Sequence, residues 1–327
     1  MRAARARDHG RLVDLRAGIA GYGLAGSVFH APLIDAVDGL SVAAVMTRSP
    51  ERAAQARAAH DDVRIVESVD DLVADIDVLV VASPNSSHAE LALAGIGRGL
   101  HVVVDKPMAT TAADARHVAE AGGERVTVFH NRRWDGDFLT VQRLVRDGTL
   151  GPITRFESRF ERFRPQIKEG WRERDPVQGG GVLLDLGPHL VDQALQLFGP
   201  PVSVYGEVLT RRQDAQVDDD AFIALRHAGG AISHLWMSAI APLHGPRFRV
   251  SGMERGFASD GLDPQEAQLR EGMRPGDPGF GEVDGLETGN YAAFYEGVRD
   301  WVRDEAPPPV DPWDAVRVLE ILEEARG

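Results

Sequence analysis

Short apolar runs alternate with helix-like segments over about the first 130 residues of the chain. Runs rich in β-branched residues predict strands, and apolar positions three and four apart predict helices. The predicted strands are 15–20, 41–46, 63–66, 78–82, 101–104 and 126–129, and the predicted helices are 26–37, 50–59, 69–74, 87–98 and 112–121. Near-continuous apolar strands suit a parallel sheet that is buried on both faces. The pattern therefore predicts a doubly wound α/β domain over residues 15–132.

Beyond residue 150 the pattern changes to strands of mixed polarity, with little helix after Gly199. The predicted strands are 153–163, 202–209, 221–227, 231–238 and 247–252, and residues 227–230 predict a hairpin turn. Segment 270–286 predicts a long loop, and segments 290–304 and 313–325 predict helices separated by a proline run. We predict a second, α+β domain over residues 133–327, with a large, mostly antiparallel, open-faced sheet. Its last helices can pack back on the first domain.

Composition narrows the class of protein. A chain of 327 residues with 43% hydrophobic and 26% charged residues fits a soluble protein of two domains. A net charge of -14 argues against a nucleic-acid partner. The absence of cysteine excludes disulfides, thiolate catalysis and cysteine–metal sites.

No apolar run has the length of a membrane span, so we expect no membrane partner and a cytoplasmic location. Residues 1–14 are basic and lack the apolar core of a signal peptide. We expect a disordered lead-in there, with an arginine-rich targeting segment as the alternative.

The most informative motif is Gly-Tyr-Gly-Leu-Ala-Gly at 21–26, between a predicted strand and a predicted helix. In a dinucleotide-binding turn Gly21 allows the tight turn, Gly23 lets the backbone approach a pyrophosphate, and Gly26 lets helix and strand pack closely. The N–H groups at the helix start then face the phosphates. We therefore predict that this loop, with Tyr22 and Leu24, binds a nicotinamide dinucleotide.

The end of strand 41–46 bears on the choice of cofactor. In NAD-selective domains an acidic residue here holds the adenosine ribose, but this strand ends in Met46-Thr47-Arg48-Ser49. Arg48, with Thr47 and Ser49, can bind a 2′-phosphate through charge-assisted hydrogen bonds. NADP is therefore favoured over NAD. A plain surface role for Arg48, and a ribose contact from Glu51, are the alternatives.

The segment Ser83-Pro84-Asn85-Ser86-Ser87-His88 follows the fourth predicted strand. It lies at the carboxyl edge of the sheet, where ligands bind in open α/β folds. The predicted cofactor contacts are Pro84, Asn85 and His88, with Asn85 bonding a ribose hydroxyl or an amide. A simple helix cap is the alternative.

The segment Asp105-Lys106-Pro107 follows the fifth predicted strand at the same edge. A lysine there points into the crevice, and its ammonium can stabilise the alkoxide that develops as a hydride leaves. We predict that Asp105, Lys106 and Pro107 also contact the cofactor. The alternative is a solvated surface lysine.

A third segment, 179–192, carries three glycines followed by Asp185, Pro188 and His189. Asp185 and His189 are four residues apart, so they share one face of a helix that bends at Pro188 or begins there. A histidine oriented by a carboxylate is a good general base near neutral pH. A buried core histidine and half of a metal site are alternatives. No further ligand at a recognisable spacing is visible, so no metal is expected.

Together and in this order, GYGLAG at 21–26, SPNSSH at 83–88, DKP at 105–107 and GGGVLLDLGPHLVD at 179–192 resemble the Gfo/Idh/MocA oxidoreductase family. SVFHAPLI at 27–34, FHNRRWDGDFLT at 129–140 and FRPQIKEGWRE at 163–173 are similar to its NADP-dependent scyllo-inositol dehydrogenase branch. The resemblance implies a Rossmann domain, an open-faced α/β domain whose sheet often builds an oligomer interface, and catalytic roles for Lys106, Asp185 and His189. Glutamate usually stands in the family where this chain has Asp105.

We therefore predict hydride transfer between a secondary alcohol of a cyclic polyol or sugar and NADP. In this mechanism His189 takes the hydroxyl proton, Lys106 stabilises the alkoxide, and Asp185 orients the substrate and His189. The polar groups predicted to bind the substrate are Asn131, Arg133, Trp134, Arg164 and Trp171. Arg132 and Arg162 are candidates for surface ion pairs instead.

Two other functions stay open. One is an aldose or deoxysugar dehydrogenase, or a ketosugar reductase, of the same family. The other is a non-catalytic NADP-sensing regulator, which we expect to lack part of the Lys106, Asp185 and His189 set. The expected partners are a small polyol or sugar and further copies of the chain, in a dimer or tetramer built through the C-terminal sheet.

Overall fold

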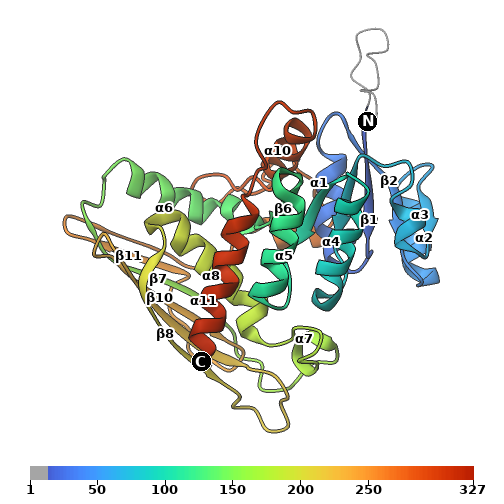
Figure 1. Cartoon of the computed structure of the whole chain (residues 1–327). Coiled ribbons are helices and arrows are strands. Elements are labelled where there is room, and N and C mark those ends of the chain that lie inside the picture. The colour runs from blue at the N-terminus through green and yellow to red at the C-terminus, as the bar shows by residue number, and fades with distance from the viewer. Residues whose placement is uncertain (1–13) are drawn as a thin grey trace.

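The computed structural model describes residues 14–327, which build two sheets that lie side by side with helices between and around them (Figure 1). The predicted lead-in at 1–14 falls, apart from Asp14, outside the described residues.

The first sheet is parallel throughout and has the strand order β3-β2-β1-β4-β5-β6. Its strands are β1 Leu15–Ala20, β2 Leu40–Met46, β3 Arg64–Val66, β4 Val78–Val81, β5 His101–Asp105 and β6 Val126–Phe129. All residues of β4 and β6 are buried, as expected for strands covered on both faces. The order reverses between β1 and β4, which is where open α/β sheets bind their ligands. The predicted doubly wound sheet is confirmed.

Helices pack on both faces of this sheet. They are η1 Ala25–His30, α1 Ala31–Asp35, α2 Pro50–Ala59, α3 Val69–Leu72, η2 Asn85–Ser87, α4 His88–Gly97, α5 Ala112–Gly122 and η3 Gly123–Arg125. The helix predicted at 26–37 divides, because η1 has wide π-type turns and Pro32 in α1 has no N–H to donate to the preceding turn. Side-chain caps fix the start of other helices, as Thr111 does by accepting from the backbone N of Asp114.

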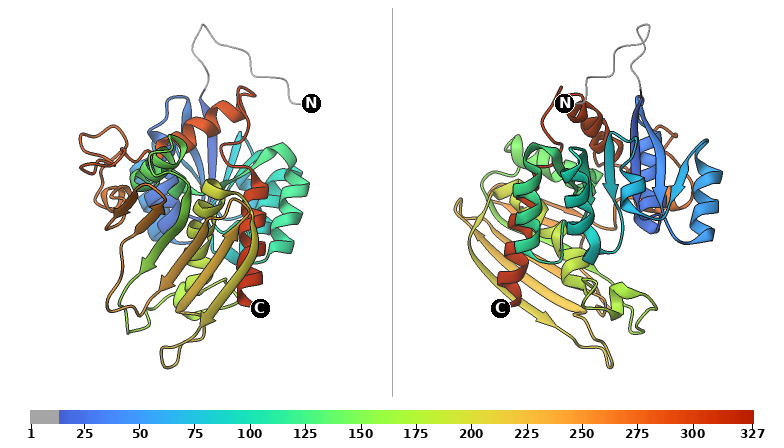
Figure 2. Two further views of the ribbon diagram at one scale, coloured as in Figure 1. Left: turned by 90° about the vertical axis from the view of Figure 1, so that its left-hand side faces the viewer. Right: turned by 45° about the vertical axis from the view of Figure 1, so that its right-hand side comes forward.

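The second sheet has the order β12-β11-β7-β10-β9-β8. Its strands are β7 Ile153–Glu161, β8 Pro201–Leu209, β9 Asp220–His227, β10 Ile232–Ser238, β11 Phe248–Gly252 and β12 Gly256–Ser259. Only β7 and β10 pair in parallel, so the sheet is mostly antiparallel, as predicted. Helices cover one face, and the other face is open (Figure 2).

The remaining helices are η4 Asn131–Trp134, α6 Gly136–Arg146, α7 Trp171–Arg174, α8 Val182–Phe198, α9 Gln265–Arg270, α10 Ala292–Val302 and α11 Pro312–Arg326. Helix α8 runs through Pro188, so the alternative in which a helix begins at Pro188 is wrong. The physical reason is a cap from a distant residue. Asp218 accepts from the backbone N–H groups of Val182 and Leu183 and starts the helix six residues earlier. Among residues 14–327, no helix has both the length and the apolar character needed to cross a membrane.

Helix α11 joins the two halves, because it packs on α5 and β6 of the first half and on α8 and β8 of the second. Close packing against β8 depends on Gly206. A Cβ there would lie 2.6 Å from both Cα and Cβ of Ala325 and would also collide with its carbonyl oxygen.

We expect Gly206→Ala to push α11 off β8 and to lower the free energy of unfolding by about 1–3 kcal/mol, the usual result of overpacking. Urea denaturation measures this change. Gly229→Ala is the matched control, because a Cβ at Gly229 meets no atom within 4 Å. Equal stability of the two variants would show that α11 does not need this close contact.

Candidate active site

The glycine loop at the end of β1 has the geometry of a dinucleotide cradle. Gly21 has φ of +99°, and a Cβ on it would lie 2.8 Å from the carbonyl oxygen of Ala82. A Cβ on Gly26 would collide with the carbonyl of Gly21. At Gly23 the nearest atoms are those of the Arg52 guanidinium, at 3.9 to 4.0 Å. Packing therefore requires glycine at positions 21 and 26. Gly23 leaves open space beside the Arg52 guanidinium, and a space of this kind fits the pyrophosphate of a dinucleotide.

The side chain of Tyr22 points away from that open space. It is only 2% exposed, and its hydroxyl lies 2.9 Å from Nε2 of His60, whose Nδ1 lies 2.9 Å from a carboxylate oxygen of Asp35. Burial, aided by Asp35, raises the pKa of Tyr22 to about 12. Tyr22 therefore anchors the loop through its side chain, whereas Leu24 is 40% exposed at the start of η1.

The turn after β2 presents two guanidinium groups, Arg48 and Arg52. The Thr47 hydroxyl accepts from the backbone N of Ser49, and the Ser49 hydroxyl accepts from that of Arg52, so both hydroxyls shape the turn. Arg48 is exposed, and neither Arg48 nor Arg52 forms a side-chain ion pair within residues 14–327. The predicted anion-binding position thus carries an additional cation, Arg52, which the sequence analysis did not select.

At the end of β4, Asn85 faces the second half of the chain. It is buried, and its Nδ2 donates to the carbonyl of Gly179 at 3.2 Å. His88 is fully buried, with its ring nitrogens 2.7 Å from the carbonyl of Pro107 and 2.9 Å from that of Ser83. The Nδ1 contact joins this segment, which includes Pro84, to the Lys106–Pro107 loop, and the Nε2 contact lies within the segment. The His88 ring therefore supports the loop, and its contact with the cofactor stays a prediction.

The three consecutive glycines lie where separate segments converge. A Cβ on Gly179 would lie 2.9 Å from Thr110, one on Gly180 would lie 2.7 Å from the carbonyl of Trp171, and one on Gly181 would lie 2.5 Å from Asp218. No side chain fits at these positions. The glycines therefore let the first residues of α8 approach the carboxyl edge of the first sheet.

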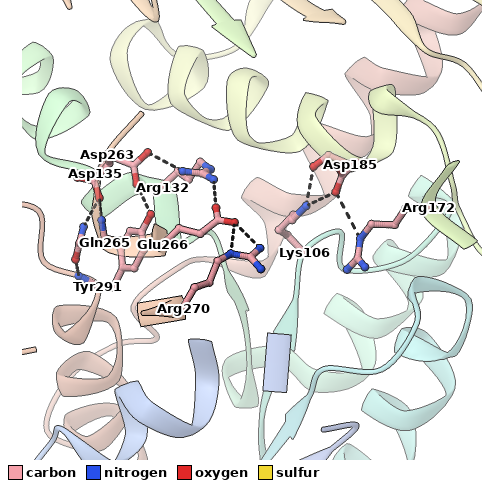
Figure 3. Close-up of polar contacts among 10 residues, drawn as sticks. All are labelled: Lys106, Arg132, Asp135, Arg172, Asp185, Asp263, Gln265, Glu266, Arg270 and Tyr291. Atoms are coloured by element: carbon pink, nitrogen blue, oxygen red, sulfur yellow. Dashed lines mark hydrogen bonds and ion pairs between the residues drawn. The ribbon is translucent and has the colours of Figure 1, made fainter. Parts of the chain in front are cut away.

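Lys106 and Asp185 meet at this edge (Figure 3). The Lys106 Nζ donates to the backbone carbonyl of Asp185 at 2.6 Å and to its Oδ1 at 3.3 Å, and Arg172 Nε lies 3.8 Å from the same Oδ1. Burial acts to raise the pKa of Asp185, but Lys106, Arg172 and Arg162 outweigh it and hold that pKa below its ordinary value. Asp185 is therefore an ionised carboxylate that orients the lysine.

His189 lies one helical turn after Asp185 and is 6% exposed. Burial and the nearby charges of Lys106 and Arg132 lower its pKa well below 6.5, so the imidazole is neutral at physiological pH. Its Nδ1 has no hydrogen-bond partner among the described residues. Within residues 14–327 no hydrogen bond joins Asp185 to His189, and the predicted orientation of His189 by Asp185 is replaced by the contact with Lys106.

The loop that carries Lys106 is supported from behind. Asp105 Oδ1 accepts from the backbone N of Lys106 at 2.9 Å and lies 3.9 Å from Nε2 of His30. His30 Nδ1 is 2.6 Å from the hydroxyl of Tyr295, and burial lowers the His30 pKa to about 4. The peptide between Lys106 and Pro107 is cis. Asp105 thus fixes the backbone at the catalytic candidate Lys106 and lies close to the helix that follows the glycine loop.

Three of the five residues predicted to bind substrate lie on η4, and two of them, Arg133 and Trp134, are engaged in the protein itself. Arg133 Nε donates to Asp192 at 2.8 Å, and its Nη2 donates to Asp314 at 3.0 Å. Asn131 is buried at the start of η4, and Trp134 packs edge-on against Phe294 with ring centroids 5.6 Å apart. Arg133 is therefore held by two carboxylates, and its contact with a substrate stays a prediction.

The other two, Trp171 and Arg164, belong to the segment that leads from β7 to α8. Arg172 stacks on the Trp171 ring at 4.4 Å and places its Nε near Asp185. Arg164 is half-buried, and its backbone N donates to Ala239. This segment supplies a ring, two guanidinium groups and a link to Asp185.

A second polar cluster, also drawn in Figure 3, could not be predicted from the sequence. Glu266 Oε2 accepts from Arg132 at 2.8 Å, and its Oε1 accepts from Arg270 at 2.8 Å. Arg132 also pairs with Asp135 and is 8% exposed, so the predicted surface ion pair is a buried one. Arg162 forms no ion pair with any described residue. The four-residue spacing of Glu266 and Arg270 is visible in the sequence, but their proximity to Arg132 is not.

No group of three or more His, Asp or Glu side chains in the described part of the chain is arranged to hold a metal ion. The residues gathered at the edge are instead an ammonium, a carboxylate and a neutral imidazole. These groups can stabilise an alkoxide and accept a proton.

Comparison with known proteins defines the class. A sequence model of an oxidoreductase family with an NAD-binding Rossmann fold matches residues 15–131, and a model of the GFO/IDH/MocA C-terminal domain matches residues 138–258. The chain is an oxidoreductase of the Gfo/Idh/MocA family.

Relatives cover nearly the whole chain. It is 34% identical to scyllo-inositol 2-dehydrogenase (NADP(+)) IolW of Bacillus subtilis, over 96% of this chain and 94% of that protein. It is 38% identical to the oxidoreductase YdgJ of Escherichia coli, over 95% of each. The solved structure of the oxidoreductase YvaA from Bacillus subtilis superposes with a TM-score of 0.88 at 32% identity, covering 96% of each chain.

The depressed pKa of His189 gives a prediction for alcohol oxidation. A base must be unprotonated, so a lowered pKa keeps the rate high as the pH falls through 6.5, the ordinary histidine value. We expect the acidic limb of kcat/KM, measured from about pH 5 to 8, to lie below pH 6.5. Cofactor binding followed by fluorescence over the same range is the control. An acidic limb centred at or above that pH would remove His189 as the base.

Proposed function

We propose that this protein transfers a hydride between a secondary alcohol of a cyclic polyol or sugar, of the scyllo-inositol kind, and NADP. The observation that carries the proposal is the meeting of the Lys106 ammonium with the Asp185 carboxylate, one turn from the neutral His189, at the sheet edge next to the glycine loop. The name of the relative IolW, a scyllo-inositol 2-dehydrogenase, supports the substrate class.

Each residue has a distinct part in this mechanism. When bound, the nicotinamide ring accepts or supplies the hydride. Neutral His189 accepts the hydroxyl proton, and the Lys106 ammonium stabilises the negative charge that develops on the oxygen. Asp185 holds that ammonium in place through the 3.3 Å contact. The glycine loop and Asn85 would hold the cofactor beside these groups.

The alternatives differ in substrate or in class. An aldose or deoxysugar dehydrogenase, or a ketosugar reductase, would use the same three side chains. A cofactor-sensing regulator has no need of a neutral buried imidazole beside an oriented ammonium, so the polar arrangement favours catalysis.

The test is NADPH formation, followed by absorbance, with scyllo-inositol, myo-inositol and common aldoses, each with NADP and NAD. We expect turnover with a polyol, and Lys106→Met should lower kcat by at least about a hundredfold while NADPH still binds. Tight NADPH binding without turnover of any polyol or sugar would favour the sensor.

The choice of NADP over NAD has its support in Arg48 and Arg52, which form no ion pairs with described residues at the end of β2. A carboxylate that would repel a 2′-phosphate is absent from the strand end, which reads Met46-Thr47-Arg48.

We expect Arg48→Ala to raise the Kd of NADPH about 10- to 100-fold, the effect of losing a charge-assisted hydrogen bond, and to leave that of NADH unchanged. Fluorescence titration measures both constants. Arg57→Ala, an exposed arginine in the last turn of the same helix, is the control. If Arg48→Ala weakens the binding of NADPH and NADH equally, Arg48 contacts a part of the cofactor that both share.

The open face of the second sheet supports the proposal of a homo-oligomer, either a dimer or a tetramer. Tyr205 is 57% exposed there, and the rings of Phe222 and Trp236 lie 5.2 Å apart. Arg159 stacks on Trp236 at 3.9 Å and pairs with Glu157 at 2.7 Å. Aromatic rings beside paired charges of both signs suit a self-complementary contact.

We expect Trp236→Glu to reduce the oligomer to a smaller species, because it places a charge in the middle of the ring cluster. Light scattering after size exclusion measures the mass. Ala58→Glu adds the same charge to an exposed position on α2 and is the control. A wild-type monomer, or an unchanged mass in Trp236→Glu, would rule out this interface.

A further inference from the structure

A second carboxylate, Glu266 on α9, acts together with Asp185 on the charge of Arg162. Its side chain is 29% exposed, and Figure 3 draws it with its partners Arg132 and Arg270. Each of its oxygens already accepts from a guanidinium, one from Arg132 and one from Arg270. A carboxylate oxygen has two lone pairs, so both oxygens can still accept from a ligand.

Glu266 is held rigidly by buried neighbours. Gln265 is fully buried, and its side chain accepts from the backbone N of Tyr291 at 2.7 Å and donates to the carbonyl of Trp134 at 3.2 Å. Arg132 is fixed by Asp135, which also accepts from the Tyr291 hydroxyl at 2.6 Å. A polar group supported in this way has the properties of a preformed binding group.

Arg162 is a cation on which both carboxylates, Asp185 and Glu266, act. Side chains alternate along a strand, so Arg162, just past β7, continues the face of Phe160. The Phe160 ring lies 6.2 Å from that of His189 and 4.8 Å from the Arg132 guanidinium, so this face looks toward both clusters. Arg162 forms no ion pair with described residues, and Asp185 and Glu266 both act on its charge.

The balance of charge identifies the ligand chemistry. A hydroxyl group can accept from Arg162 and donate to Glu266 at the same time. A phosphate or carboxylate group could accept from Arg162, but it has no hydrogen to donate to Glu266. The pair therefore suits adjacent hydroxyl groups better than a phosphate or a carboxylate.

We propose that Glu266 and Arg162 form a subsite that recognises a vicinal diol of the substrate, away from the carbon that is oxidised. The inference rests on the proposed function and adds to it two residues that set specificity. Neither residue contacts Lys106 through any hydrogen bond or ion pair in residues 14–327, so neither touches the ammonium that faces the reacting oxygen.

The test compares Glu266→Gln with the wild type on the best polyol and on its analogue lacking one hydroxyl of the diol. Loss of a hydrogen bond to a charged group corresponds to about a 10- to 100-fold change. We expect Glu266→Gln to raise KM by about that factor, with kcat within about threefold and NADPH affinity unchanged. Glu271→Gln, exposed just beyond α9, is the control.

Two further arms guard against a merely structural effect. In the wild type, the KM of the deoxy analogue should exceed that of the polyol by the same factor by which Glu266→Gln raises the KM of the polyol. In Glu266→Gln, the KM of the deoxy analogue should rise little further. Arg162→Met should raise the KM of the polyol in the same way. Arg162→Lys keeps the charge and should raise this KM less. A thermal melt shows whether each variant folds like the wild type.

The outcomes separate the two proposals. If the wild type oxidises a polyol and both variants keep its KM within about twofold, the diol subsite is wrong and the proposed function stands. If Arg162→Met weakens only substrates that carry a carboxylate or phosphate, the group recognised is an anion and the subsite is again wrong. If the wild type turns over no polyol or sugar, the proposed function fails and the inference fails with it.

Discussion

The hydrogen bond from the Lys106 ammonium to Asp185 is the interaction on which the rest of the site depends. Lys106 follows a strand of the parallel sheet, and Asp185 stands in the first turn of a helix that packs on the other sheet, 79 residues later. The contact exists only when both halves are docked. Asn85 bonded to Gly179, and α11 packed against both halves, hold them in that position. The reacting groups are therefore assembled by the interface between halves.

The docking of the two halves also determines the balance of charge at the site. Lys106, Arg172 and Arg162 act on Asp185, while Arg132 and Arg270 share Glu266, so cations outnumber the carboxylates that face them. An excess of positive charge in a partly dry site favours an alkoxide over an alcohol. The same charge and the burial keep His189 neutral, which is the form that accepts a proton. The same positive charge thus stabilises the alkoxide and keeps His189 in the form that accepts its proton.

The parts of the site that depend on local sequence pattern could be predicted from the sequence. The glycine loop, the lysine after β5, and the two residues one turn apart on α8 could each be read from neighbours in the chain. The roles of His88 and Arg133 could not, because their partners Pro107, Asp192 and Asp314 lie 19, 59 and 181 residues away. The same holds for Glu266, which pairs with Arg132 across 134 residues. Residue type predicts that a polar group needs a partner, and only the fold decides which one.

The cluster behind Glu266 is hard to explain as a device for stability. Burial raises the pKa of Asp135 to about 7, with Asp137 and Asp263 adding to the rise against the opposing charge of Arg132. A carboxyl whose pKa is raised above its unfolded value of 3.8 stabilises the fold at low pH, and this contribution is lost as the pH rises toward 7. Near neutral pH the ionised Asp135 therefore opposes folding, whereas its neighbours Arg132 and Glu266 are held in their charged forms. What the cluster provides is position, because Arg132 holds Glu266 and Asp135 holds Arg132. A polar network that tolerates a buried carboxyl of raised pKa while fixing Glu266 in one place is better understood as part of the binding site than as part of the core.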